Sequence, residues 1–166
     1  MSVVCVKKHN NHFEFAADSI CLQGSTKVKI GDFAKLESVN NIIFGSVGYA
    51  DEMALFRLFM ETNMPLAPTE RDVTDFFFKF YRWKNEIGCE FSPKNQYLIG
   101  FKGKAFYVSD MFAKEITNYS AIGAGMDYSL TALHLGYTAE QAVKVACELC
   151  CYVSEPIITY KMAIEE

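Results

Sequence analysis

The order of strand-like and helical segments restricts this chain to a layered fold. Two β-branched or alternating runs, residues 3–6 and 13–17, flank a polar turn at 9–12 and predict a hairpin. Later patterns predict, in order, strands near 19–23, 27–30, 35–38 and 42–47, helices near 50–62 and 73–87, a hairpin at 97–101 and 105–108, a small-residue segment at 120–125, helices near 128–135 and 139–149, and a strand at 157–162. This order predicts a layered α/β or α+β domain, with two sheets between helical layers.

Composition narrows the class of protein further. The chain has 166 residues, of which 51% are hydrophobic and 22% charged, so we expect one well-packed domain spanning residues 1–166. The net charge of −4 and the scattered lysines argue against nucleic acid as a partner. Since there is neither a secretory-signal pattern nor an apolar run of ~20 residues, we expect no membrane segment and a cytoplasmic location.

The cysteines predict free thiols rather than a metal centre. Most of the six cysteines lie within apolar stretches, as buried thiols do in proteins of a reducing compartment. Cys147 and Cys150 have the C-x-x-C spacing, but this motif lacks a second pair and a histidine, and it falls on a predicted helix. We therefore expect no zinc site.

The last predicted helix carries its own start signal. Thr138 precedes the apolar periodic residues, and Gln141 follows three positions later. This spacing predicts a capping box, in which each side chain bonds the backbone N–H of the other residue.

The beginning of the chain has a chemical use if Met1 is removed. Methionine before a small residue such as Ser2 is generally trimmed by aminopeptidases. Ser2 would then offer an α-amine with a reference pKa of about 7.7 to 8.0 and a hydroxyl nucleophile, so one residue could serve as base and nucleophile. An uncleaved Met1 would block that amine.

Several motifs together resemble a known family. They are the runs 2–6, 15–19, 45–51, 121–125 and 136–142, together with Lys35. In this order they look like the proteasome β-type subunits and their bacterial two-ring relatives, and the resemblance extends from Ser2 to about Ile158. It implies the α+β fold of N-terminal-nucleophile hydrolases, a four-layer α-β-β-α sandwich.

The resemblance also implies catalytic roles. Ser2 is the nucleophile, and Asp18, sixteen positions later, is the supporting aspartate. The family's lysine falls on Lys35 if one residue is inserted after Gly24, with Lys27 and Lys29 as competitors. Its ammonium would lower the proton affinity of the amine.

The resemblance implies a fourth catalytic residue, Gly48, and several positions with binding roles. Gly48 matches the glycine whose backbone N–H faces the oxyanion. Ser46 and Val47 fall near the wall of the first specificity pocket, which we expect to be small and largely apolar. In the bacterial relatives a sodium ion can be held by backbone carbonyls, which here align with Cys147, Cys150 and Val153; no other cofactor is implied.

The chain departs from the family pattern at three places. The usual nucleophile is threonine, whose extra methyl group restricts the hydroxyl rotamer. Ala124 replaces the serine that supplies a supporting hydroxyl near the amine, and the family's second aspartate–serine pair is not recognisable in residues 153–156, which read Val-Ser-Glu-Pro. Reduced activity is one expected consequence.

The resemblance implies a peptidase acting on peptides or unfolded proteins. It implies homo-oligomeric rings of six or seven subunits, stacked face to face and served by an ATP-dependent unfoldase. Because the sequence shows no helical N-terminal extension like that of α-type subunits, we expect a β-like subunit. Two alternatives stay open: a catalytically inactive ring or scaffold protein, and a small-molecule amidase on the same fold.

Overall fold

Two antiparallel sheets form the centre of the molecule. The computed structural model describes residues 2–24, 26–28 and 34–164. The first sheet has the strand order β10 (Tyr119–Gly123), β1 (Val3–Lys8), β2 (His12–Ala17), β11 (Ile158–Ala163). The second has the order β5 (Leu36–Val39), β6 (Ile42–Val47), β7 (Gln96–Phe101), β8 (Lys104–Ser109), β9 (Phe112–Glu115). A separate short hairpin pairs β3 (Leu22–Gln23) with β4 (Thr26–Lys27).

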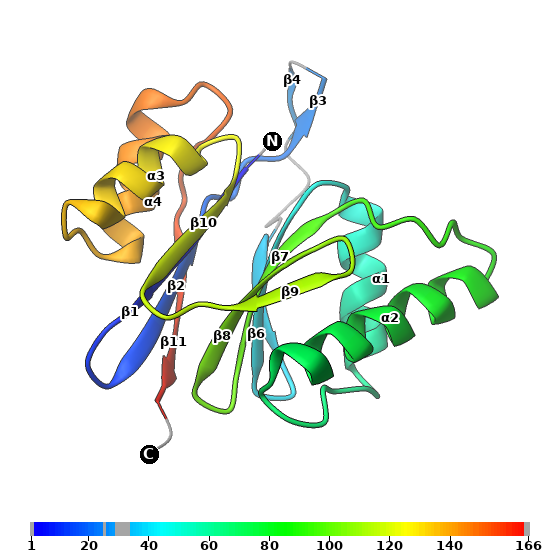
Figure 1. Cartoon of the computed structure of the whole chain (residues 1–166). Helices are drawn as coiled ribbons and strands as arrows, with labels where there is room; N and C mark the ends of the chain where they lie inside the picture. Colours follow the sequence, from blue (N-terminus) through cyan, green and yellow to red (C-terminus); the bar gives the residue numbers. More distant parts are fainter. Residues whose placement is uncertain (1, 25, 29–33, 165–166) are drawn as a thin grey trace.

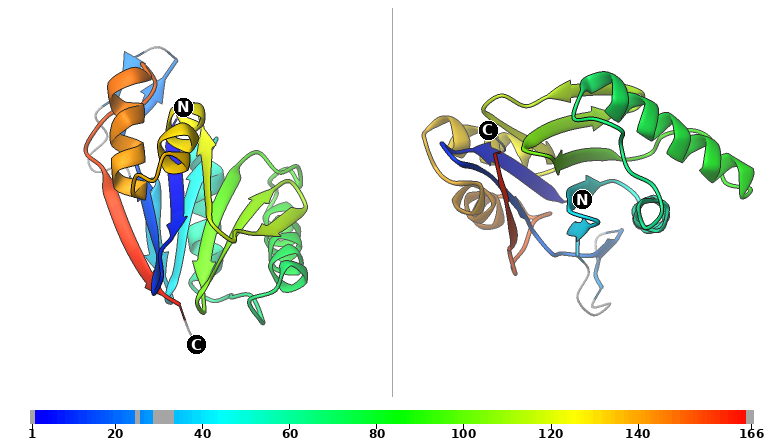
Figure 2. Two further views of the ribbon diagram at one scale, coloured as in Figure 1. Left: turned by 60° about the vertical axis from the view of Figure 1, so that its left-hand side comes forward. Right: turned by 90° about the horizontal axis from the view of Figure 1, so that it is seen from below.

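Helices cover the outer face of each sheet. The first sheet carries α3 (Met126–His134) and α4 (Ala139–Leu149), and the second carries α1 (Ala50–Met60) and α2 (Glu70–Glu86). Figure 1 shows the resulting sequence of layers from left to right, and both views of Figure 2 keep the helical pairs on opposite sides. The predicted α+β, four-layer α-β-β-α sandwich is therefore confirmed.

Three apolar layers hold these four layers together. In β1, Val3 and Cys5 pack against α3 and α4, whereas Val4 and Val6 face the second sheet. Successive side chains of a strand point to opposite faces, so a strand covered on both sides has apolar residues at every position. A third layer, rich in aromatic rings around Phe56, joins α1 and α2 to the second sheet. Full burial of each such side chain contributes about 1.5 to 3 kcal/mol.

Two glycines let the sheets approach closely. A Cβ on Gly45 would lie 2.3 Å from Cγ1 of Val4, and a Cβ on Gly100 would lie 2.5 Å from Cζ of Phe15. Both distances are shorter than real contacts. The missing side chains therefore leave room for the layer between the sheets, which brings β1 close to β6.

Most predicted elements are present, but two strands were not expected. The N-terminal hairpin, the four helices, the second hairpin and the closing strand are confirmed, with ends shifted by a few residues. The strands β9 and β10 were missed; the segment 120–125, expected only to lead into a helix, forms most of β10 because it pairs with β1. Of the strand expected at 27–30, residues 29 and 30 lie outside the described residues.

Within the described ranges, no helix combines the length and the apolar character needed to cross a membrane.

The capping box at the start of α4 is confirmed. The Thr138 N–H donates to Oε1 of Gln141 (3.0 Å), and the Gln141 N–H donates to Oγ1 of Thr138 (3.2 Å). We expect Thr138→Ala to lower the free energy of unfolding by about 1 kcal/mol. Denaturant titration checks this, with Thr131→Ala as the control, because the Thr131 hydroxyl bonds only within α3, to the Asp127 carbonyl among the described residues. Equal losses for the two variants would contradict the capping role.

Candidate active site

A buried ion pair lies where β2 ends. Asp18 directly follows β2 and is fully buried, and Lys35 is only 3% exposed. The Lys35 Nζ lies 2.8 Å from Oδ2 of Asp18. The same carboxylate accepts hydrogen bonds from the backbone N–H of Val3 (2.8 Å) and of Ile20 (3.2 Å). Asp18 therefore links the first residues of β1 to the lysine.

Burial sets the charge properties of this pair. Removal from water lowers the pKa of Lys35, and the neighbouring Asp18 carboxylate opposes that shift. Lys35 thus releases its proton more readily than a surface lysine does, while its charged form keeps a direct counter-ion. Of the two competing lysines, Lys27 is exposed on β4, whereas Lys29 lies outside the described residues.

Ser2 is held directly before β1, an inner strand of the first sheet. It is 5% exposed, and its carbonyl accepts a hydrogen bond from the Gly125 N–H at 3.2 Å. Gly123 has φ +97°, and a Cβ at this position would lie 2.3 Å from the Ser2 carbonyl oxygen. The turn between β10 and α3 therefore fits closely against the Ser2 backbone, and only glycine at 123 allows that approach.

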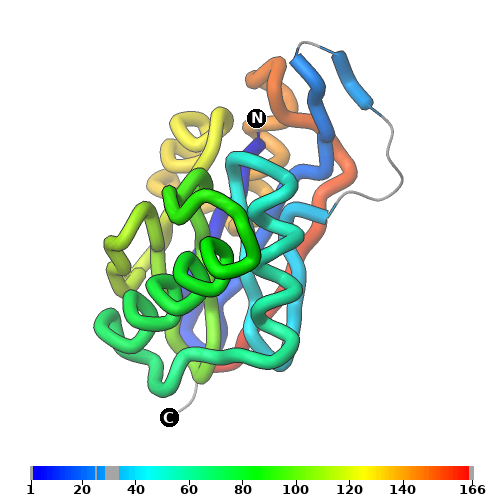
Figure 3. Tube along the Cα trace, turned by 90° about the vertical axis from the view of Figure 1, so that its right-hand side faces the viewer, coloured from blue at the N-terminus to red at the C-terminus, as the bar shows by residue number. Residues whose placement is uncertain are grey.

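A cavity of about 300 Å³ brings the separate elements together. Its lining includes Ser2, Ile20, Lys35, Ser46, Gly48 and Met53. Figure 3 shows the N-terminal end of the chain near the segment that enters α1. Three of the four predicted catalytic residues thus share one cavity, and the fourth, Asp18, bonds Lys35 from within the core.

Gly48 lies in the turn between β6 and α1. Its φ of +134° is strained for any residue with a side chain, and a Cβ here would lie 2.2 Å from Oδ1 of Asn95. Glycine therefore serves two purposes: it permits the backbone conformation, and it lets Asn95 pack directly against the turn.

The two predicted pocket residues lie in different environments. Ser46 lines the cavity, and its Oγ accepts a hydrogen bond from Nδ2 of Asn95 at 2.9 Å. Val47 belongs to the apolar layer between the sheets and is not one of the residues that line the cavity. Adjacent residues of a strand face opposite sides of the sheet, so only one of the two can point into the cavity.

Part of the site was not predicted from the sequence. Leu22, Tyr49 and Met53 also line the cavity, and Asn95 contacts its wall from a loop 46 residues after Tyr49. Asn95 follows the mixed segment 90–94, which is typical of a loop and gives its burial no local signal.

The segment implied as a sodium site follows α4. Cys147 lies in the last turn of α4, where carbonyls lack helical partners and carry partial negative charge. The Cys150 carbonyl accepts the Val153 N–H at 3.1 Å, and a second lone pair remains on that oxygen. These donors suit a hard cation, so the sodium site stays a prediction that the segment's chemistry allows. No cluster of His, Cys, Asp or Glu side chains within the described ranges could hold a metal ion.

This chain is similar to known proteins in its structure but not detectably in its sequence. No family sequence model and no curated protein sequence matches the chain. BPH from Thiobacillus denitrificans, solved in complex with epoxomicin, has a TM-score of 0.89 at 17% identity, over 99% of this chain and 100% of that one. Anbu (ancestral β-subunit) from Yersinia bercovieri has a TM-score of 0.73 at 14% identity, over 96% and 80%. Eukaryotic HslV from Trypanosoma brucei has a TM-score of 0.71 at 13% identity, over 97% of this chain and 99% of that one.

These likenesses define the fold class. The chain has the proteasome-type fold of N-terminal-nucleophile hydrolases, as its motifs implied. Among the solved structures that share this fold, BPH from Thiobacillus denitrificans aligns with the chain over nearly its whole length.

Proposed function

We propose that the protein is an N-terminal-nucleophile peptidase in which Ser2, exposed by removal of Met1, attacks the substrate. The observation that carries this proposal is the shared cavity of Ser2, Lys35 and Gly48, with Asp18 bonded to both Lys35 and the Val3 N–H. These groups come from four separate segments of the chain. Structural packing alone does not require a buried lysine beside a terminal serine.

The chemistry follows from the groups present. The Ser2 α-amine takes the proton from Oγ as Oγ bonds to the substrate carbonyl carbon. The Gly48 N–H stabilises the resulting oxyanion, and the amine then passes the proton to the leaving nitrogen as the C–N bond breaks. Water, deprotonated by the same amine, cleaves the ester and restores Ser2.

Lys35 supplies the electrostatic condition for this cycle. A free α-amine has a pKa of about 7.7 to 8.0, and a nearby positive charge lowers that pKa. The amine is then neutral near pH 7 and can accept a proton. Asp18 keeps Lys35 charged and fixes its position.

A groove beside the cavity favours peptides over small amides as the substrate. A groove of about 860 Å³ lies along α1 and shares Ala50 and Met53 with the site cavity. An extended chain could occupy this groove while its scissile bond lies at Ser2. Rates on a short amide and on an unfolded protein separate the alternatives: turnover of the short amide alone would favour an amidase.

The proposal includes assembly and location. We infer a homo-oligomeric ring in the cytoplasm, fed by an ATP-dependent unfoldase, from the fold shared with BPH, Anbu and HslV. Native mass spectrometry tests the ring directly. A stable monomer at micromolar concentration would contradict it.

Intact-mass measurement tests the catalytic proposal. Protein made in its native host should have the mass expected after loss of Met1. Epoxomicin, which the related BPH structure contains, should add covalently at Ser2. Retention of Met1 in that protein would rule out catalysis by Ser2.

One observation favours the inactive ring or scaffold protein. Ala124 lies between Gly123 and Gly125, both of which contact the Ser2 backbone, and its side chain has no hydroxyl to support the amine. A processed Ser2 that neither labels nor turns over peptides would support this alternative.

Restoring the missing hydroxyl should raise activity. We expect Ala124→Ser to increase peptide turnover about fivefold, which corresponds to one hydrogen bond of ~1 kcal/mol near the amine. Initial rates measure the effect, with Ala163→Ser as the control, because this exposed residue of β11 lines neither the cavity nor the groove along α1. Unchanged or lower rates for Ala124→Ser would show that no such contact forms.

A further inference from the structure

We propose that Asn95 is a positioning residue that holds the Gly48 turn in its working conformation. This inference rests on the proposed function, in which the Gly48 N–H stabilises the oxyanion. It further assigns to a buried ion pair, Glu52 and Lys84, the task of holding Asn95. The outer helical layer would thereby control the geometry beside Ser2.

The Asn95 side chain bonds the turn on both sides of Gly48. Its Oδ1 accepts the Tyr49 N–H at 2.6 Å, and its Nδ2 donates to the Tyr49 carbonyl at 2.8 Å and to Oγ of Ser46 at 2.9 Å. Asn95 is 4% exposed, so these bonds are shielded from water. Both amide protons and the amide oxygen are therefore used on the residues that flank Gly48.

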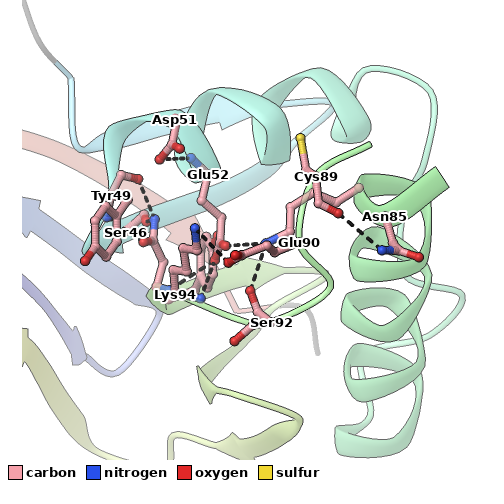
Figure 4. A network of polar contacts seen from close by, with 12 residues as sticks. Ser46, Tyr49, Asp51, Glu52, Asn85, Cys89, Glu90, Ser92 and Lys94 are labelled. Atoms are coloured by element: carbon pink, nitrogen blue, oxygen red, sulfur yellow. Dashed lines mark hydrogen bonds and ion pairs between the residues drawn. The ribbon is translucent and has the colours of Figure 1, made fainter. Parts of the chain in front are cut away.

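The backbone of Asn95 is held by Glu52 in the first turn of α1. One oxygen, Oε1, accepts the N–H groups of Asn95 (3.0 Å) and Lys94 (3.1 Å). It also accepts the Tyr97 hydroxyl at 3.2 Å, and burial beside this carboxylate raises the pKa of Tyr97, so the hydroxyl stays protonated and donates. Figure 4 shows Glu52 reaching from α1 toward the segment of Lys94, with the Ser46–Tyr49 turn beside it.

Lys84 of α2 completes the network. Its Nζ lies 2.6 Å from Oε2 of Glu52 and donates to the Ser92 carbonyl at 3.0 Å. Lys84 and Glu52 are 3% and 2% exposed. A buried pair with its remaining bonds satisfied allows few alternative geometries, because each broken bond would leave a buried polar group unpaired.

The hydrogen bonds around the Gly48 turn exceed what packing of the turn requires. A turn between a strand and a helix can be held by backbone bonds alone, yet this one uses a buried amide from a loop outside β6 and α1. The turn also lines the cavity that contains Ser2. A donor that must match a transition state is the kind of group whose position needs such support.

The effect of losing Asn95 should appear in kcat rather than KM. A displaced oxyanion donor costs transition-state stabilisation but little ground-state binding. We expect Asn95→Ala to lower kcat about ten- to a hundredfold, less than outright loss of an oxyanion donor. KM for a fluorogenic peptide amide should change by less than about threefold, since substrate contacts stay in place.

Asn95→Asp is the conservative variant. It keeps the acceptor for the Tyr49 N–H and the side-chain volume, but it replaces the Nδ2 donor by an oxygen facing the Tyr49 carbonyl. Its kcat should lie between those of wild type and Asn95→Ala. The matched control is Asn85→Ala, which removes a bond from another asparagine to the Cys89 carbonyl, at the far end of the same loop, and does not touch the turn.

Hydrogen exchange provides a readout that needs no catalysis. Mass spectrometry of peptides covering residues 46–50 should show faster exchange in Asn95→Ala, a smaller increase in Asn95→Asp and none in Asn85→Ala. If wild type does not turn over peptides, the proposed function fails and this exchange pattern alone decides the positioning role. If Asn95→Ala does not fold, Asn95→Asp is judged by the same two readouts.

Two results would overturn the inference. One is an exchange rate at 46–50 that is the same in wild type and the Asn95 variants. The other is an active wild type whose Asn95 variants lose activity only through KM, or no more than Asn85→Ala does.

Discussion

Replacement of Ser2 by alanine is expected to abolish peptide turnover while leaving the fold intact. The variant keeps the α-amine, the Gly125 N–H bond to the residue 2 carbonyl and the neighbouring Asp18–Lys35 pair, and it loses only Oγ. We expect a fall of roughly a thousandfold or more, because loss of a nucleophile leaves only binding and oxyanion stabilisation. Initial rates on a fluorogenic peptide and intact mass after epoxomicin treatment measure the effect.

The control separates the nucleophile from other serines. Ser109→Ala changes a half-buried serine at the end of β8, which lines neither the cavity nor the groove along α1, and should retain both turnover and labelling. Measurable turnover by Ser2→Ala at rates near wild type would show that another group attacks the substrate. Loss of the fold in Ser2→Ala, seen by circular dichroism, would mean that Oγ has a structural role instead.

The second large effect concerns Lys35. Lys35→Met leaves the Asp18 carboxylate fully buried without this cation, and we expect the free energy of unfolding to fall by about 3 to 5 kcal/mol. Turnover should also fall strongly, since the Ser2 amine would keep its proton at neutral pH. Urea titration and initial rates measure the two effects separately.

Two comparisons isolate the cause. Lys27→Met removes an exposed lysine of β4 and should change stability by less than about 0.5 kcal/mol. The double variant Asp18→Asn with Lys35→Met removes both charges and keeps an oxygen for the Val3 N–H, so it should recover part of the stability but none of the activity. Wild-type stability and turnover in Lys35→Met would contradict both roles.

Local patterns were sufficient for most of the fold. The alternation in β1 and β2, the periodic apolar faces of the helices and the Thr138–Gln141 pair each depend on residues within a few positions of one another. The four-layer arrangement followed from the order of these elements together with the family motifs. The strands β9 and β10 were not predicted, because β9 is short and β10 becomes a strand by pairing with β1, which is far away in the sequence.

The candidate site likewise contains residues that the sequence predicted and residues that it did not. The family resemblance implied Ser2 and Asp18, and in the structure Asp18 accepts a hydrogen bond from the N–H of Val3, the residue after Ser2. Lys35 needed an assumed insertion, and Val47, expected near the pocket wall with Ser46, lies in the apolar layer between the sheets. The catalytic roles themselves stay predictions until the variants above are measured.

The amino-acid sequence by itself determined the order of the elements and the capping of α4, because each depends on neighbours along the chain. Tertiary structure alone decided which groups share the cavity and how Asn95, Glu52 and Lys84 hold the Gly48 turn. Hydrogen bonds between residues more than thirty positions apart leave no periodic signal, since their geometry exists only once the layers have packed.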